Sequence, residues 1–135
     1  IKKDNISNLK IYDNNIELLL DNFDFKKKID EFWILFPDPW PKKKHQKRRL
    51  INENFLCKIS RLIRNTGKLY IASDSKSYIL SILLTVSKMK NFTWLNNLPY
   101  KWQYSSQNTI ETKYYKKALK NDRKSIILIF QKHST

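Results

Sequence analysis

The sequence is poor in glycine and cysteine, and it contains no long apolar run. Its 135 residues include one glycine, Gly67, and one cysteine, Cys57. A single cysteine excludes an intramolecular disulfide, which fits a reducing compartment. No apolar segment approaches the roughly 20 residues that a transmembrane helix needs, and the N-terminus has no signal-peptide pattern. These absences predict a soluble, cytoplasmic protein with no membrane partner.

Acidic residues are also scarce relative to basic ones. The chain has 27 Lys and Arg against 12 Asp and Glu, a formal net charge of +15. An excess of this size favours an anionic partner, with nucleic acid first and an acidic membrane surface second. Lysine and asparagine are abundant throughout, as an AT-rich genome would produce, so part of the excess is compositional. The 41% hydrophobic content predicts a folded core, in a single domain spanning residues 1–135.

Strand-like and helix-like segments alternate along the chain. Short apolar runs predict strands at 8–12, 31–36, 69–73, 92–95 and 125–130. Helical spacing predicts helices at 14–23, 52–64 and 78–89, whereas residues 96–124 show little periodicity. This alternation predicts an α/β fold with a mainly parallel sheet.

Three single residues carry local predictions. Asn52 is expected to be the N-cap of the helix at 52–64. Gly67 follows that helix, where a C-cap favours a residue that tolerates positive φ. Cys57 lies on the apolar side of the same helix and is expected to be buried.

Two aspartates directly follow predicted buried strands. Asp38 stands in FPDPW after the strand at 31–36, and Asp74 follows the strand at 69–73. Ligands bind at the carboxyl ends of strands in an open parallel sheet, so both carboxylates are expected at the rim of one crevice. Pro37 and Pro39 restrict the backbone on both sides of Asp38, which favours a rigid mount for a functional side chain. For Asp74, an ordinary turn or helix-cap role is the simpler interpretation.

The basic segment KKKHQKRR, residues 42–49, follows the Asp38 turn directly. It has three interpretations: a solvated helix start, a localisation-type basic cluster, or a ridge that binds phosphates. Its position at the ligand end of the sheet favours the third, in which the segment grips a polynucleotide backbone while one base is presented to Asp38. Trp40 could stack on that base or pack at the rim. His45 and His133 lack the spacing of a metal site, and no serine stands in a G-x-S-x-G context.

The stretch FPDPWPKKKHQKRRL, residues 36–50, closely resembles the signature of the bacterial tRNA (guanine-N7)-methyltransferases. The similarity continues through the helix at 52–64, the Ser-Asp turn at 73–74 and the Thr-Lys-Tyr sequence at 112–114. It implies a class I S-adenosylmethionine-dependent methyltransferase fold, Rossmann-like, with a mainly parallel sheet and an antiparallel last strand. It also implies methyl transfer from S-adenosylmethionine to N7 of a guanine in the tRNA variable loop.

The same resemblance implies roles for individual residues. Asp38 would be catalytic and lie close to the methyl donor and the guanine, and Asn15 would be near the cofactor adenine. The substrate-binding residues would be Lys42, Asp74, Thr112, Lys113, Tyr114 and Tyr115. The RNA-binding residues would be Lys44, His45, Gln46, Lys47, Arg48 and Arg49.

The sequence departs from the family pattern at three places. Asn15 stands where the family usually has aspartate, and Tyr115 stands where glutamate is common. The third departure is that the glycine-rich turn of the cofactor site is missing, because the single glycine is at position 67. The chain is therefore expected to be a C-terminal portion, as a truncated piece, a decayed gene product, or half of a split enzyme completed by a separate chain or missing segment. The alternative function is a non-catalytic RNA-binding remnant; a basic ribosome-associated protein is a weaker one.

Overall fold

A four-stranded sheet organises the computed structural model, which describes residues 6–22, 26, 28–103 and 111–134. The strands β1 (Ile29–Leu35), β2 (Ile63–Ser73), β3 (Phe92–Trp94) and β4 (Ile126–Lys132) lie in the order β1-β2-β4-β3. β1 and β2 are parallel, and β4 runs antiparallel to both β2 and β3. Three strands thus point one way and the last strand in sequence opposes them. This confirms the predicted α/β sheet with an antiparallel last strand.

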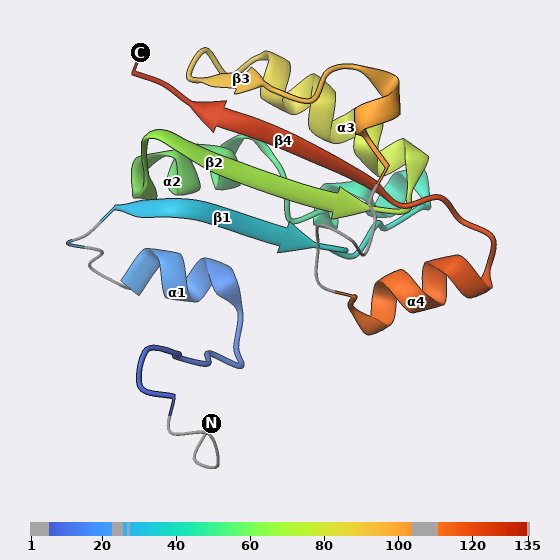
Figure 1. Cartoon of the computed structure of the whole chain (residues 1–135), viewed down its shortest axis with the longest axis horizontal. Helices are drawn as coiled ribbons and strands as arrows, with labels where there is room; N and C mark the ends of the chain where they lie inside the picture. The colour runs from blue at the N-terminus through green and yellow to red at the C-terminus, as the bar shows by residue number, and fades with distance from the viewer. Residues whose placement is uncertain (1–5, 23–25, 27, 104–110, 135) are drawn as a thin grey trace.

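The described part of the chain contains four α-helices and two short 3-10 helices, and the α-helices flank the sheet (Figure 1). The α-helices are α1 (Ile16–Asn22), α2 (Glu53–Leu62), α3 (Lys76–Ser87) and α4 (Lys113–Lys120), and the 3-10 helices are η1 (Lys43–Arg48) and η2 (Pro99–Lys101). Asn52 caps α2 as predicted, because its side chain accepts a hydrogen bond from the Phe55 amide. Side chains alternate along each strand, so α2 and α3 pack on one face of the sheet and α4 packs on the other.

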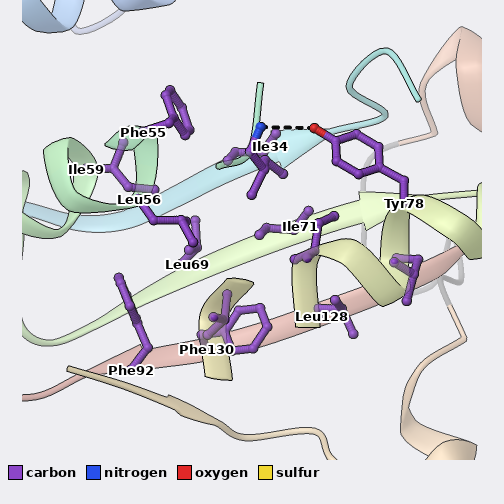
Figure 2. Close-up of a cluster of buried hydrophobic side chains, with 14 of the residues drawn as sticks. Ile34, Phe55, Leu56, Ile59, Leu69, Ile71, Tyr78, Phe92, Leu128 and Phe130 are labelled. Carbon is purple, nitrogen blue, oxygen red and sulfur yellow. Dashed lines mark hydrogen bonds between the residues drawn. The ribbon is translucent and has the colours of Figure 1, made fainter. Parts of the chain in front are cut away.

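The main core lies between the sheet and the helix pair α2 and α3 (Figure 2). Leu56 and Ile59 from α2 meet Leu69 and Ile71 from β2, and all four are fully buried. Tyr78 of α3 is also fully buried, and its hydroxyl accepts a hydrogen bond of 3.0 Å from the Ile51 amide. Each such aliphatic side chain contributes about 1.5–3 kcal/mol by leaving water, so this face provides most of the apolar stabilisation.

The opposite face of the sheet has a smaller core. Under α4, Ala72 of β2 and Ile127 of β4 are buried together with Tyr115. Farther along this face, the rings of Trp33 and Tyr70 stack with centroids 3.8 Å apart and planes 5° apart. Trp33 nevertheless keeps 41% of its surface exposed.

Two predicted backbone features are wrong. Residues 8–12 form no strand, and Ile11 within them is 72% exposed. Gly67 is not a helix cap, because α2 ends at Leu62 and passes directly into β2, with Thr66 as the residue of positive φ (68°). Glycine is needed at position 67 for another reason: a Cβ there would lie 2.7 Å from Ile63 Cγ2 and 3.0 Å from the Asp30 carbonyl oxygen of the neighbouring strand.

Two predictions about helices also need correction. Cys57 is exposed on α2, not buried. The segment 96–124, which lacks clear periodicity over its full length, contains η2 and α4. Helix α4 has only two turns, so its pattern is diluted by the polar residues on either side.

Candidate functional site

The Asp38 turn follows the carboxyl end of β1 and has an unusual backbone. The Phe36 amide donates to the Ala72 carbonyl at 2.8 Å, which extends the contact with β2 one residue past the end of β1. Phe36 and Trp40, the aromatic residues on either side of Pro-Asp-Pro, both have positive φ, at 53° and 42°. Bulky residues rarely adopt this conformation, and it persists only where surrounding contacts hold it.

Side chains from the basic segment provide such contacts. The Arg49 Nε donates a hydrogen bond of 2.8 Å to the Pro39 carbonyl. The Arg48 guanidinium lies over the Trp40 ring at 5.1 Å from its centroid. The His45 ring meets Trp40 edge-on, with ring centroids 5.9 Å apart. The segment behind the turn therefore folds back onto it.

Asp38 and Asp74 line one cleft of about 420 Å³. The structure brings the two carboxylates together, as expected for residues that follow two adjacent parallel strands. The full lining consists of Phe36, Pro37, Asp38, Pro39, Asp74, Ser75, Tyr114, Lys117 and Arg123. A cleft of this size, with apolar walls and a few charged groups, suits a small ligand or one nucleoside of a larger one.

The two carboxylates have different surroundings. Asp74 accepts from Arg123 Nε at 2.5 Å, and its side chain is only 19% exposed. It does not cap α3, because Ser75 is the N-cap. Among the described residues none forms a salt bridge with Asp38. Asp38 is therefore the carboxylate that can accept hydrogen bonds from a ligand, while Asp74 holds Arg123 at the cleft.

Arg123 and Lys117 belong to this cleft but were missed by sequence reasoning. Lys117 lies on α4, and Arg123 follows that helix, with its amide bonded to the Ala118 carbonyl at 2.9 Å. The sequence did carry a signal, because Tyr115 and Ala118 stand three residues apart among lysines, which is the spacing of a short amphipathic helix.

The segment 112–115 begins α4 rather than lining the cleft as a unit. Thr112 is the N-cap, and its Oγ1 accepts from the Tyr115 amide at 3.1 Å. Tyr115 is buried against the sheet, whereas Tyr114 lines the cleft and is 52% exposed. The Lys113 ammonium lies 5.2 Å from the centre of the Tyr114 ring. Of these four residues, Tyr114 is the one that the structure brings to Asp38.

Residues 42–49 form an exposed cationic surface with one exception. Lys42, Lys43, Lys44, Lys47 and Arg48 are exposed, and His45 and Gln46 are half-buried. Arg49 is 5% exposed. The surface begins directly after the Asp38 turn, so a bound polyanion would pass close to the cleft.

The described residues do not complete a site for S-adenosylmethionine. Asn15 is exposed at the start of α1, where its Oδ1 accepts from the Glu17 amide at 2.8 Å, and it does not line the Asp38 cleft. The chain's one glycine is inside β2, so there is no glycine-rich turn to let such a ligand approach the backbone. Within the described ranges no three His, Cys, Asp or Glu residues group to hold a metal ion. No helix there is long and apolar enough to cross a membrane.

Comparison with known proteins identifies the family. Residues 1–128 match the family described as "Putative methyltransferase". The chain belongs to this methyltransferase family. It is 37% identical to a tRNA (guanine-N(7)-)-methyltransferase of Wolbachia pipientis over 92% of its own length and 52% of that protein. It is 36% identical to one of Rhodospirillum rubrum over 77% of its own length and 41% of that protein. The chain thus spans about half the length of these curated relatives.

A solved structure shares the fold of this methyltransferase family member. An rRNA methylase from Streptococcus thermophilus superposes with a TM-score of 0.57 at 15% identity. The match covers 98% of this chain and 63% of the other. At this identity the likeness concerns the fold alone, and it supports the Rossmann-like methyltransferase architecture.

Proposed function

We propose that the protein is the tRNA-binding portion of a tRNA (guanine-N7)-methyltransferase that acts in the cytoplasm. The observation that carries this proposal is the Asp38 carboxylate, which forms no salt bridge with any described residue and stands on a strained turn in a cleft beside an exposed cationic surface. The relatives from Wolbachia pipientis and Rhodospirillum rubrum, which bear this name, support it. The residues present supply recognition of a base and of a phosphate backbone.

The chemistry of guanine N7 suits such a site. N7 carries a lone pair and no proton, so transfer needs no strong general base and depends on positioning the base. The Asp38 carboxylate can accept hydrogen bonds from guanine N1–H and from the exocyclic amine, a pattern that selects guanine over adenine. Tyr114, exposed at the same cleft, can stack on the base. Lys117 brings positive charge for a neighbouring phosphate, whereas the charge of Arg123 is paired with Asp74.

The cofactor half of the reaction requires residues beyond those described. Because the glycine-rich turn is absent, we propose that a separate chain or a further segment supplies it. Two features support this. β1 is an edge strand whose outer side pairs with no described strand, and Trp33 is exposed on the sheet face that α4 leaves uncovered. Unpaired strand edges and exposed aromatic residues are typical of surfaces that bind another polypeptide.

Because the residues that the structure describes do not complete a cofactor site, there is a second candidate, a non-catalytic RNA-binding remnant. The two functions share tRNA affinity and differ in methyl transfer. Labelled S-adenosylmethionine and tRNA lacking N7-methylguanine distinguish them, with the chain assayed alone and with its N-terminal counterpart from a relative. Transfer to guanine supports the enzyme; salt-sensitive tRNA binding without transfer under both conditions supports the remnant.

Substitution of Asp38 tests the site itself. Asp38 is exposed in the chain. Asp38→Asn keeps the shape but replaces one acceptor oxygen by a donor, so we expect transfer to fall by at least about a hundredfold, since a mispaired polar group that the bound base covers costs a few kcal/mol. tRNA affinity should change less than about twofold, because the phosphate contacts remain. Asp30→Asn is the control: it removes the same charge at the far end of β1, where Asp30 pairs with exposed Arg64. Equal loss in both variants would contradict the role of Asp38.

A further inference from the structure

Arg49 differs from every other cation of the basic segment. Lys42, Lys43, Lys44, Lys47 and Arg48 are exposed to solvent, whereas Arg49 is 5% exposed. A buried guanidinium that pairs with protein groups has few donors left for a phosphate. The basic segment therefore contains two kinds of cation, although its sequence, KKKHQKRR, does not distinguish them.

The buried guanidinium joins two parts of the site. Its Nε donates to the Pro39 carbonyl at 2.8 Å, one residue after Asp38. Its Nη2 donates to the Ser77 Oγ at 3.0 Å, and its Nη1 to the Ser77 carbonyl at 3.4 Å. Ser77 lies in the first turn of α3, which follows β2. Arg49 thus fastens the Asp38 turn of one strand to the helix that follows the next strand.

A ring and a second hydrogen bond fix the guanidinium in place. It lies over the Tyr78 ring, 4.8 Å from the centroid. The Tyr78 hydroxyl in turn accepts from the Ile51 amide, two residues after Arg49. Tyr78 is fully buried, so this support belongs to the main core and not to the surface. The planar fork of arginine suits this stacked, multiply bonded position, and lysine could not reproduce it.

We propose that Arg49 is a positioning residue for Asp38 and not a contact to RNA. The turn between Phe36 and Trp40 is strained by two positive φ angles, so it needs external contacts to persist. Arg49 supplies them from the packed core and sets where the Asp38 carboxylate stands in the cleft. The exposed lysines carry the affinity for the polyanion. The part of this inference that concerns guanine rests on the proposed function; the contact between Arg49 and the turn does not.

Nuclear magnetic resonance of arginine Nε–H groups tests the contact without any RNA. We expect one Nε–H signal of the chain to exchange with water far more slowly than the rest. Arg49→Lys should remove that signal, and the control Arg48→Lys should leave it, because Arg48 is exposed. If the slow signal survives in Arg49→Lys, Arg49 does not hold the turn and the proposal is wrong.

Salt-dependent tRNA binding tests the division of roles. Arg49→Gln should leave the slope of log affinity against log salt unchanged. Lys47→Gln, the control in the same segment, should reduce the slope by about one, as expected when one phosphate contact is lost. A reduced slope in Arg49→Gln would overturn the proposal. If the unaltered chain fails to bind tRNA, the proposed function fails, and the resonance experiment still decides whether Arg49 holds the turn.

Kinetics separate positioning from charge. Arg49→Lys keeps the charge, so a phosphate contact would survive it and kcat would be unchanged. If Arg49 positions Asp38, kcat measured together with the N-terminal counterpart from a relative should fall by on the order of tenfold to a hundredfold at saturating tRNA, with KM for tRNA nearly unchanged. Ser77→Ala removes one acceptor without altering any charge and should lower kcat by a smaller factor, about threefold. Unchanged kcat in both variants would contradict a positioning role.

Discussion

The two faces of the sheet differ in how completely they are covered. On one face, α2 and α3 bury Leu56, Ile71 and Leu128 completely. On the other, α4 is the described helix that packs on the sheet, and it covers the end near Ala72 and Ile127. The rest of that face carries a stacked pair of aromatic rings with one of them 41% exposed. The helices on the first face bury a full core, whereas on the second face the described residues leave a large aromatic side chain partly exposed.

A polar group also distinguishes the second face. Glu31 accepts from Trp33 Nε1 at 3.1 Å and from the Tyr70 hydroxyl at 3.3 Å. The stacked rings are thus fixed by one carboxylate, so the second face offers a rigid aromatic platform. Rigid aromatic residues are common at the centres of protein interfaces because they lose little conformational entropy on binding.

The largest expected effect lies on the packed face. Leu56→Ala should lower the free energy of unfolding by about 3 kcal/mol, from lost burial and the cavity that remains. Urea unfolding followed by circular dichroism measures this. Leu84→Ala is the control on α3: Leu84 is 58% exposed, so the loss should stay below about 1 kcal/mol. Similar losses in the two variants would mean that the main core is not where the structure has it.

An intermediate effect is expected on the second face. Trp33→Ala removes the stack with Tyr70 and should cost about 1 kcal/mol in the chain alone, the usual value for an aromatic pair. The same urea titration applies. A loss as large as that of Leu56→Ala would show that the second face is a full core and remove the reason to expect a covering polypeptide.

The smallest expected effect is on the pH dependence of stability. It can be compared for two tyrosines, one from each face of the sheet. Burial raises the pKa of Tyr78 above its ordinary value of 10.0, and hydrogen bonding with Ile51 partly opposes this. Burial and, secondarily, Glu31 raise the pKa of Tyr70. The unfolded chain then loses these protons first, so the associated stability is complete below pH 10 and declines as pH rises toward the folded-state pKa.

Replacing each tyrosine by phenylalanine removes its share of this decline. Above pH 10 the unfolding temperature should fall with pH, and Tyr78→Phe should reduce this fall more than Tyr70→Phe does, because Tyr78 is fully buried. Thermal unfolding from pH 8 to 11 provides the measurement. A larger flattening from Tyr70→Phe would reverse the ranking of the two faces.

Sequence reasoning predicted the elements that have strong local signals. The strands at β1, β2, β3 and β4 and the helices α2 and α3 have clear apolar patterns, and Asn52 marked the start of α2. Gly67 was misread because its role depends on the approach of Asp30 and Ile63, which is a tertiary contact. Helix α4 was missed because two turns give few repeats of the helical period.

The candidate site was predictable in its outline. The positions of Asp38 and Asp74 after adjacent parallel strands were enough to bring them to one cleft. The pairing of Asp74 with Arg123 was not predictable, since the two are 49 positions apart and meet only when α4 folds back. Nor could the sequence separate Arg49 from Arg48, because burial depends on α3 and not on the neighbouring residues.

The strand order has a consequence for how the chain acquires its fold. β4 comes after all the other strands in sequence, yet it lies between β2 and β3 in the sheet. Until β4 has left the ribosome, β3 has no strand beside it and β2 has a partner on one side only. The sheet therefore cannot grow strand by strand during synthesis. Its contacts join distant positions, such as Ile71 with Leu128, so folding should be slow for a domain of this size, and the sheet should form only after β4 has been synthesised.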